Sequence, residues 1–408
     1  MTGITCALAG GFSAGGGAAF QSGVTSLTNA SWNYITYTAP QISYVGADSS
    51  GNPIWLWGFK DSSNSYSKCM LIRVNSNGSV SQSSVTTLEA SANPKYDVSV
   101  TTEYPNASQG WAFYSASDTY FYAKTFSIDK DALSIGTPGS ALKVFPTIGQ
   151  VSFTHAAYAG NNRAFVTTRD DGSGGNGVTF FSRSTNTITK VGNMSDLGDQ
   201  SVFHSMIGFD YSSASSGLYR WAGQTYGPNL QVGYYNGSSA SSVYNFNATE
   251  FLTGFSYTNG NPMVNVNGSN KFVMFGKSGT NGLVARAGTI TWPTSGTAAP
   301  TMSSGTQISL TDAANGGLWA PAKSYTSDEC YFVYKNNSNS NWYYRKLTLS
   351  SNTITEGSAT QITNTPSSAT GFIHSMAGTA STSTGNWLVF LTDNSGSANP
   401  DFTVVKLT

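Results

Sequence analysis

The chain has 408 residues, of which 39% are hydrophobic and 13% aromatic, so it is long enough for one large domain or two ordinary ones. Charged residues make up only 10% of the chain, and 20 Lys and Arg balance 20 Asp and Glu to give a formal net charge of zero. This balance argues against nucleic acid or an anionic membrane as a partner, since both need a basic surface. No stretch approaches the roughly 20 apolar residues of a membrane span, so we expect no membrane insertion.

The N-terminal segment divides into two parts. Residues 1–19, MTGITCALAGGFSAGGGAA, are rich in Gly and Ala and resemble no later part of the chain. Residues 20–30, FQSGVTSLTNA, resemble residues 303–313, SSGTQISLTDA. The start has no basic region and only a short apolar run, so we expect no secretory signal and folding in a cytoplasm.

An apolar and aromatic run that ends in polar residues recurs along the chain. The first copies are IWLWGFKD (54–61) and GWAFYSASD (110–118), and the last is NWLVFLTDN (386–394). The equivalent positions are Trp55, Trp111, Ala164, Leu218, Phe272, Tyr331 and Trp387, with spacings of 56, 53, 54, 54, 59 and 56 residues. Seven copies at about 55 residues indicate a repeat architecture.

Each copy contains more than this run. A second run follows after a turn, and six copies carry a basic residue in it: Arg73, Lys124, Arg183, Arg286, Arg345 and Lys406. A further run, such as SVTTLEA (84–90) or TQISLTD (306–312), closes the copy, and a Gly- or Ser-rich run opens it. No stretch keeps a helical apolar period, so the pattern predicts four short strands per copy and almost no helix.

Seven copies of four strands predict an all-β, seven-bladed β-propeller. A linear solenoid is the weaker alternative, because it needs polar caps at both ends. The last copy stops after its third strand, TVVKLT, at Thr408. We therefore expect residues 20–30 to pair beside it as the outer strand of the last blade, which removes an open edge. The predicted division is an anchoring arm over 1–19 and the propeller over 20–408.

The three histidines occupy similar settings. His204 and His374 each lie in a His-Ser-Met stretch three periods apart, and His155 lies in VSFTHAAYAG. We expect all three to line the central channel from the first strand of blades three, four and seven. A ligand or metal site at the channel mouth is the alternative, but zinc would need three imidazoles to converge at about 2.1 Å. We expect neither a metal nor a cofactor.

Three aromatic residues are candidate binding residues. Trp32 and Trp319 fall on predicted connections between copies, and Tyr226 falls in a turn of the fourth copy. Flat rings beside Asn and Ser can stack on sugars, and packing between blades is the alternative.

Motifs of enzymatic chemistry are missing from the sequence. There is no G-x-S-x-G elbow or phosphate-binding loop, so we predict no catalytic residue. TDNSGSANPD (392–401) has oxygen donors in Asp393 and Asp401 that would suit calcium, but it lacks the EF-hand spacing.

Two features resemble bacteriophage virion proteins. The start MTGITCALAGG with its Gly-rich continuation resembles the N-termini of such proteins, and KLTLSSNTITEGSATQI resembles phage-encoded propeller repeats. The resemblance implies a non-enzymatic structural protein of the virion, associated with the tail and present in multiple copies, with a host surface glycan as a further candidate partner. Residues 1–19 would then contact other virion proteins. The alternative is a lectin or glycan-active enzyme with a site at the channel mouth.

Overall fold

The computed structural model describes residues 21–32, 41–90, 98–103, 107–116, 120–143, 151–170, 176–194, 205–209, 219–224, 230–235, 251–252, 263–266, 270–278, 282–293, 299–310, 318–324, 328–336, 338–366, 377–394 and 397–407. Every regular element in these ranges is a β-strand. Within them, nothing is a helix long and apolar enough to cross a membrane.

The described strands form seven antiparallel sheets, each of which is ordered from its innermost strand outwards. The first sheet contains β2 (Gln41–Ala47), β3 (Pro53–Lys60), β4 (Ser67–Val74), β5 (Val80–Gln82) and β6 (Thr86–Glu89). The second contains β7 (Ser99–Thr102), β8 (Gln109–Ser115), β9 (Phe121–Asp129), β10 (Ser134–Ile135) and β11 (Leu142–Lys143). The third contains β12 (Val151–Gly160), β13 (Arg163–Asp170), β14 (Asn176–Ser184) and β15 (Thr187–Met194).

The remaining sheets follow the same order. The fourth contains β16 (Ser205–Phe209), β17 (Tyr219–Gln224) and β18 (Leu230–Tyr235). The fifth contains β19 (Met263–Asn265), β20 (Lys271–Ser278), β21 (Gly282–Thr291), β22 (Thr301–Ser304) and β23 (Ile308–Leu310). The sixth contains β24 (Trp319–Lys323), β25 (Glu329–Lys335), β26 (Trp342–Ser350), β27 (Thr353–Glu356) and β28 (Thr360–Gln361). The seventh contains β29 (Ala377–Thr382), β30 (Gly385–Asn394), β31 (Ser397–Leu407) and β1 (Ser22–Ser26).

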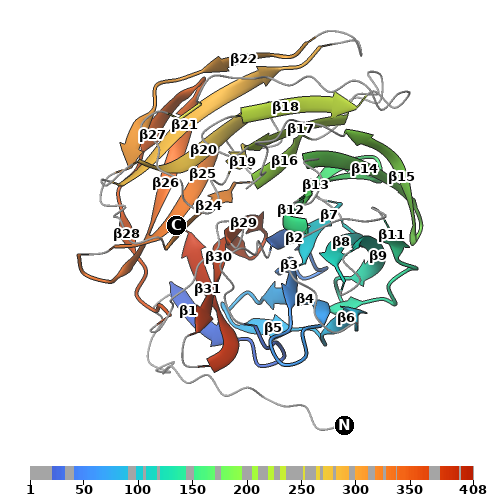
Figure 1. Cartoon of the computed structure of the whole chain (residues 1–408). Coiled ribbons are helices and arrows are strands. Elements are labelled where there is room, and N and C mark those ends of the chain that lie inside the picture. Colours follow the sequence, from blue (N-terminus) through green and yellow to red (C-terminus); the bar gives the residue numbers. More distant parts are fainter. Residues whose placement is uncertain are drawn as a thin grey trace, which may run out of the picture.

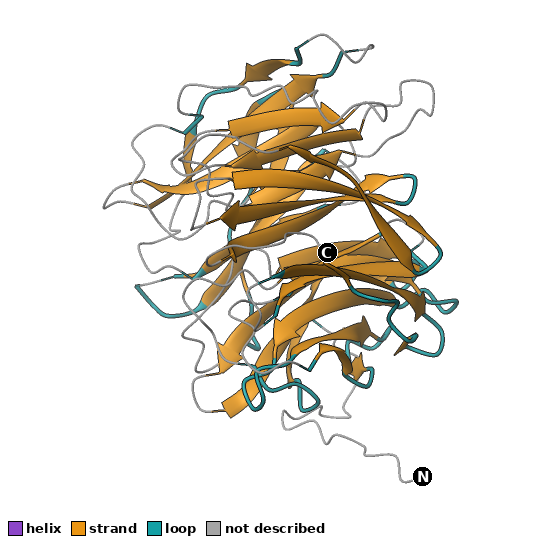
Figure 2. Cartoon of the chain, turned by 45° about the vertical axis from the view of Figure 1, so that its right-hand side comes forward, coloured by secondary structure: helices purple, strands orange, loops and turns teal. Residues whose placement is uncertain are grey.

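The innermost strands of successive sheets are neighbours. They contact one another in the order β2, β7, β12, β16, β19, β24 and β29, and β29 contacts β2. The sheets are therefore arranged around a common centre, as Figure 1 shows, and Figure 2 shows their strands from another side. This arrangement of short antiparallel sheets is a β-propeller.

The core lies between adjacent sheets. Trp342 of the sixth sheet stacks on Phe390 of the seventh at 5.1 Å between ring centroids, and Phe275 stacks on Phe332 at 5.9 Å between the fifth and sixth. Second strands are therefore covered on both faces, and all residues of β3 except Lys60 are buried. This explains why these strands are continuous apolar runs, whereas β26 alternates buried and exposed residues over its second half.

The N-terminal strand β1 completes the seventh sheet. It pairs antiparallel with β31, from Ser22 opposite Val405 to Ser26 opposite Asp401. The chain stays attached beyond the strand, because the amide of Leu27 donates to the carbonyl of Pro400 at 2.9 Å and the Leu27 side chain is fully buried. Residues 1–20, which include the predicted arm, lie outside the described residues.

The outer strands differ from the expectation of one closing strand per copy. In the first, second, fifth and sixth sheets the outer position is taken by two short strands that pair with the same third strand. The closing runs predicted from the sequence, such as residues 84–90 and 306–312, correspond to the second strand of each pair, β6 and β23 here, and the first strand of each pair was not predicted. At the break in the fifth sheet, a Cβ on Gly305 would lie 1.8 Å from the carbonyl oxygen of Asn352. A glycine is required there, and it also lets the strand bend.

The recurring basic residue does not occupy one structural position. Lys406 lies directly opposite the reference residue Trp387, whereas Arg73 lies opposite Ile54 and Lys124 lies opposite Ala112. The described basic residues share the third strand of their sheets, but their registers differ. Their partners differ as well, so the recurrence predicted the strand and not a repeated site.

Candidate functional site

The histidines are only partly described. His155 lies in the innermost strand β12, opposite Thr167, and its side chain is buried at 4% exposure. His204 and His374 lie outside the described residues. No group of three or more His, Cys, Asp or Glu residues in the described part of the chain could hold a metal ion.

Trp32 is buried and does not present a surface for a ligand. Its side chain has 0% exposure, and its ring meets Trp57 edge-on at 6.0 Å between centroids. The burial of Trp32 agrees with the alternative that its ring packs between blades, because a sugar can stack only on an accessible ring face. Trp32 thus packs the segment after β1 against the core of the first sheet.

Trp319 is also buried, at 3% exposure. It is the first residue of β24 and not part of a connection, which corrects the sequence prediction. Its ring packs against Phe275 at 6.4 Å and Phe332 at 6.1 Å, between the fifth and sixth sheets. Apolar burial therefore explains this residue, and the third binding candidate, Tyr226, lies outside the described residues.

A polar pocket lies between the sixth and seventh sheets. It is a small open depression of about 250 Å³, open solvent included, and is lined by Ser324, Glu329, Tyr331, Thr379, Ala380, Ser381, Asn386 and Leu407. The sixth sheet contributes the start of β25, and the seventh contributes the end of β29, the start of β30 and the end of β31. Ser381 and Asn386 are exposed, whereas Ser324, Glu329 and Thr379 are buried. The pocket therefore has an open rim and a buried polar wall.

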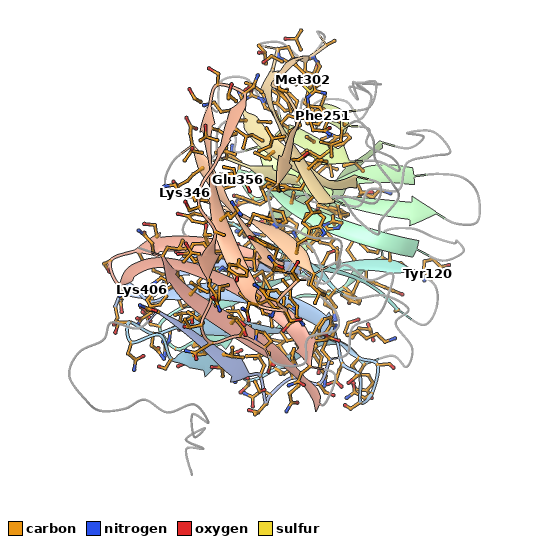
Figure 3. The ribbon with its side chains drawn as sticks, turned by 90° about the vertical axis from the view of Figure 1, so that its left-hand side faces the viewer. Tyr120, Phe251, Met302, Lys346, Glu356 and Lys406 are labelled. Atoms are coloured by element: carbon orange, nitrogen blue, oxygen red, sulfur yellow. The ribbon has the colours of Figure 1, made fainter. Side chains whose placement is uncertain are left out.

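Glu329 supplies the carboxylate of this wall and is 8% exposed. The hydroxyl of Tyr331 donates to its Oε1 at 3.2 Å and that of Ser324 at 3.4 Å. Lys346 forms an ion pair with Oε2. Lys346 itself is 47% exposed, on β26, and Figure 3 labels it. Because both hydrogen bonds to Oε1 are long, this oxygen can accept a further donor from a ligand.

Tyr331 forms the floor on the side of the sixth sheet. Burial, together with the nearby Glu329 carboxylate, raises the pKa of its phenol far above the ordinary value. The phenol therefore stays protonated at all physiological pH values and acts as a donor to Glu329. With one carboxylate, several hydroxyls and one side-chain amide in its lining, the pocket can bind a ligand that both donates and accepts hydrogen bonds.

The equivalent corner between the second and third sheets is filled. There Arg183 of β14 forms an ion pair with Glu103, and the indole of Trp111 donates to Glu103 Oε1 at 3.2 Å. Trp111 and Tyr331 are equivalent reference residues, and they lie opposite Thr101 and Ala322. Two positions further along the chain, Ser324 therefore corresponds to Glu103. The smaller Ser324 therefore lines the pocket at the corner where the second and third sheets have the larger, charged Glu103.

Sequence reasoning missed this pocket. Glu329 and Ser324 lie in and beside a connection, and neither matched a motif. The repeat did contain a signal. Glu329 lies two positions before the reference residue Tyr331, and the other copies have a neutral residue at this position. An acidic residue at a position expected to be buried indicates a polar partner.

The comparisons with known proteins bear on the fold. No protein-family model matches the chain, and no curated protein matches it in sequence. Among solved structures, the BP39L lectin from Burkholderia pseudomallei is similar with a TM-score of 0.51 at 10% identity, over 91% of this chain and 97% of the lectin. A putative 6-phosphogluconolactonase from Bacteroides uniformis gives 0.53 at 12% identity, over 87% and 97% of the two chains.

A protein from Lactobacillus plantarum is similar to the same degree, with a TM-score of 0.53 at 12% identity over 85% of this chain and 90% of that one. At such identities these likenesses show the fold alone. One fold that carries a lectin and a putative lactonase does not identify a function.

Proposed function

We propose that the protein is a non-enzymatic carbohydrate-binding propeller, and that a neutral sugar residue binds in the pocket between the sixth and seventh sheets. The observation that carries this proposal is the buried carboxylate of Glu329 at the back of an open, polar pocket. Sugar hydroxyls donate to such a carboxylate and accept from serine, threonine and asparagine side chains.

The pocket's shape and charge favour the edge of a single neutral sugar residue. Its roughly 250 Å³ includes open solvent, so the buried wall can receive one or two hydroxyl groups of a sugar whose ring stays at the open rim. An anionic sugar would find no cation to pair with, because the described lining contains no Lys or Arg and the nearby Lys346 is already paired with Glu329. Glycoside hydrolysis uses two facing carboxylates, and the described lining contains one, which supports binding over hydrolysis. A solved lectin of similar fold is consistent with this proposal.

The pocket also depends on how the ring is completed. We propose that the seven sheets are the blades of one closed propeller and that β1 supplies the last outer strand. The pairing of β1 with β31 and the contact between β29 and β2 support this. Closure holds the seventh blade against the sixth, so that the two walls of the pocket keep a fixed separation.

A glycan array followed by calorimetry with the best neutral sugar tests the binding proposal. Glu329→Gln should lower affinity at least tenfold, since it replaces a charged acceptor by a weaker one. Ser381→Trp should block the exposed rim without disturbing the core.

Asp328→Asn is the matched control. Asp328 is the adjacent carboxylate, but it faces away and pairs with Lys271 of the fifth sheet at 2.8 Å. Sugar binding that survives both Glu329→Gln and Ser381→Trp would place the ligand elsewhere, and no binding by the wild type to any glycan would refute the function.

A second candidate rests on the resemblance of the N-terminus and the repeats to phage proteins. We propose that the protein is a tail-associated virion component, present in many copies, and that residues 1–19 contact other virion proteins. The position of β1 supports this, because it is the outermost strand of its sheet and the preceding chain starts from the edge of the blade. The two proposals are compatible, since a virion protein that binds sugars would attach to host glycans.

A further inference from the structure

The β30–β31 hairpin of the seventh sheet contains a buried carboxylate with neutral partners. Asp401 is 6% exposed. Its Oδ1 accepts from the hydroxyl of Ser26 at 2.7 Å, and its Oδ2 accepts from the amide of Asn394 at 3.3 Å. None of the ion pairs of the described residues includes Asp401. A buried carboxylate without a countercharge is costly, so a cation is expected beside it.

A second observation points to the same place. Thr392 has 0% exposure, and its hydroxyl has no hydrogen-bond partner. Thr392 lies directly opposite Asp401 in the β30–β31 ladder, so the two side chains project from the same face of the sheet as neighbours. An unpartnered buried oxygen next to an uncompensated carboxylate is the pattern of a ligand position that lacks its ligand.

Further oxygens surround this pair. Asn394 donates through its amide nitrogen to the Asp401 carboxylate, so its side chain lies at the same corner. Ser26 of β1 lies opposite Asp401 on the other side. We propose that this corner binds one calcium ion through Asp401, Thr392, Asn394 and Ser26.

The donor set selects the type of ion. All four side chains offer oxygen, and three of them are neutral. Calcium accepts mixed carboxylate, carbonyl and hydroxyl oxygens in a flexible shell, whereas magnesium requires a near-ideal octahedron and zinc prefers His and Cys. The site is distinct from the sugar pocket, which adjoins Leu407 and Asn386 at the other end of the same ladder.

Calcium at this position would join three strands. Ser26 belongs to β1, Asp401 to β31, and Thr392 with Asn394 to β30. The ion would therefore stabilise the attachment of the N-terminal strand.

The test is calorimetric titration of the EDTA-treated full chain with CaCl₂, combined with thermal melting. We expect one site with a Kd below about 1 mM. At a calcium concentration of about 100 Kd, the melting temperature should rise by roughly 3 °C for a chain of this length. Asp401→Asn should abolish both the heat and the shift, and Asp131→Asn, which changes an exposed acid on the second sheet, should retain both.

Thr392→Val separates a ligand from a merely structural hydroxyl. Because it removes an unpartnered polar atom without changing shape, it should leave the calcium-free melting temperature equal or higher while weakening calcium binding. No calcium heat with the wild type, a shift that persists in Asp401→Asn, or an equal shift with MgCl₂ would each overturn the assignment.

Discussion

Replacement of Leu27 by alanine tests whether the N-terminal strand is part of the folded core. Leu27 follows β1, is fully buried, and belongs to a cluster that includes Trp32, Trp57 and Phe402. Truncating a fully buried leucine costs about 2–5 kcal/mol. A chain of this length has an unfolding entropy of about 0.9 kcal/mol per degree, at roughly 2.1 cal/mol/K per residue. Leu27→Ala should therefore lower the melting temperature by about 2–6 °C.

The assay is thermal unfolding followed by circular dichroism, with tryptophan fluorescence as a second probe. Thr25→Ala, a half-buried position within β1 itself, is the control and should shift the melting temperature by less than about 1 °C. If Leu27→Ala unfolds at the temperature of the wild type, the segment that contains β1 is not docked in solution, and the closed ring proposed above is wrong.

Three further predictions concern other parts of the chain. Deleting residues 1–19 should leave the melting temperature nearly unchanged, because they precede β1, and should abolish incorporation into phage particles; normal copy number in purified virions would exclude the anchoring role. Burial opposes ionisation of Asp61, but hydrogen bonds from Lys68 and Ser63 outweigh it and lower the pKa of the carboxyl below its ordinary value of 3.8. The ionised carboxyl therefore contributes its full stabilisation above the unfolded pKa, and this stabilisation is lost as the pH falls through the lower folded pKa. The free energy of unfolding, measured in urea between pH 5 and about pH 2, should therefore fall less with decreasing pH in Asp61→Asn than in the wild type. Burial raises the pKa of the Cys69 and Cys330 thiols far above the ordinary range. In a Cys6→Ser variant, a thiol reagent at pH 8 should therefore label neither cysteine in the native protein and both after unfolding. Labelling of the native protein would contradict their burial.

The repeat carried most of the information about the fold. Trp55, Trp111 and Tyr331 are spaced at nearly constant intervals because each lies at the same place in a second strand, where both faces are buried. Pairing of residues 20–30 with the end of the chain was also predictable, since the last copy lacked a strand that the start of the chain resembled.

The site was less predictable, for a physical reason. Aromatic residues in connections can be exposed or buried, and Trp32 and Trp319 are buried because Trp57 and Phe332 pack against them. The pocket coincides with a difference between copies, in which Ser324 takes the place of Glu103. Such a difference shows only when the register of two blades is known, and sequence spacing does not supply that register.

The two-piece outer strands affect how copies of the protein meet one another. A long, straight edge strand offers a continuous row of free amides and carbonyls on which another molecule can add a strand. In this protein the exposed edge of the first sheet is shared by β5 and β6, of three and four residues, with a break at Ser83. The fifth sheet ends likewise in β22 and β23, on either side of Gly305. Each piece is too short to template a stable intermolecular sheet, so these blade edges offer a second molecule no long strand on which to add its own.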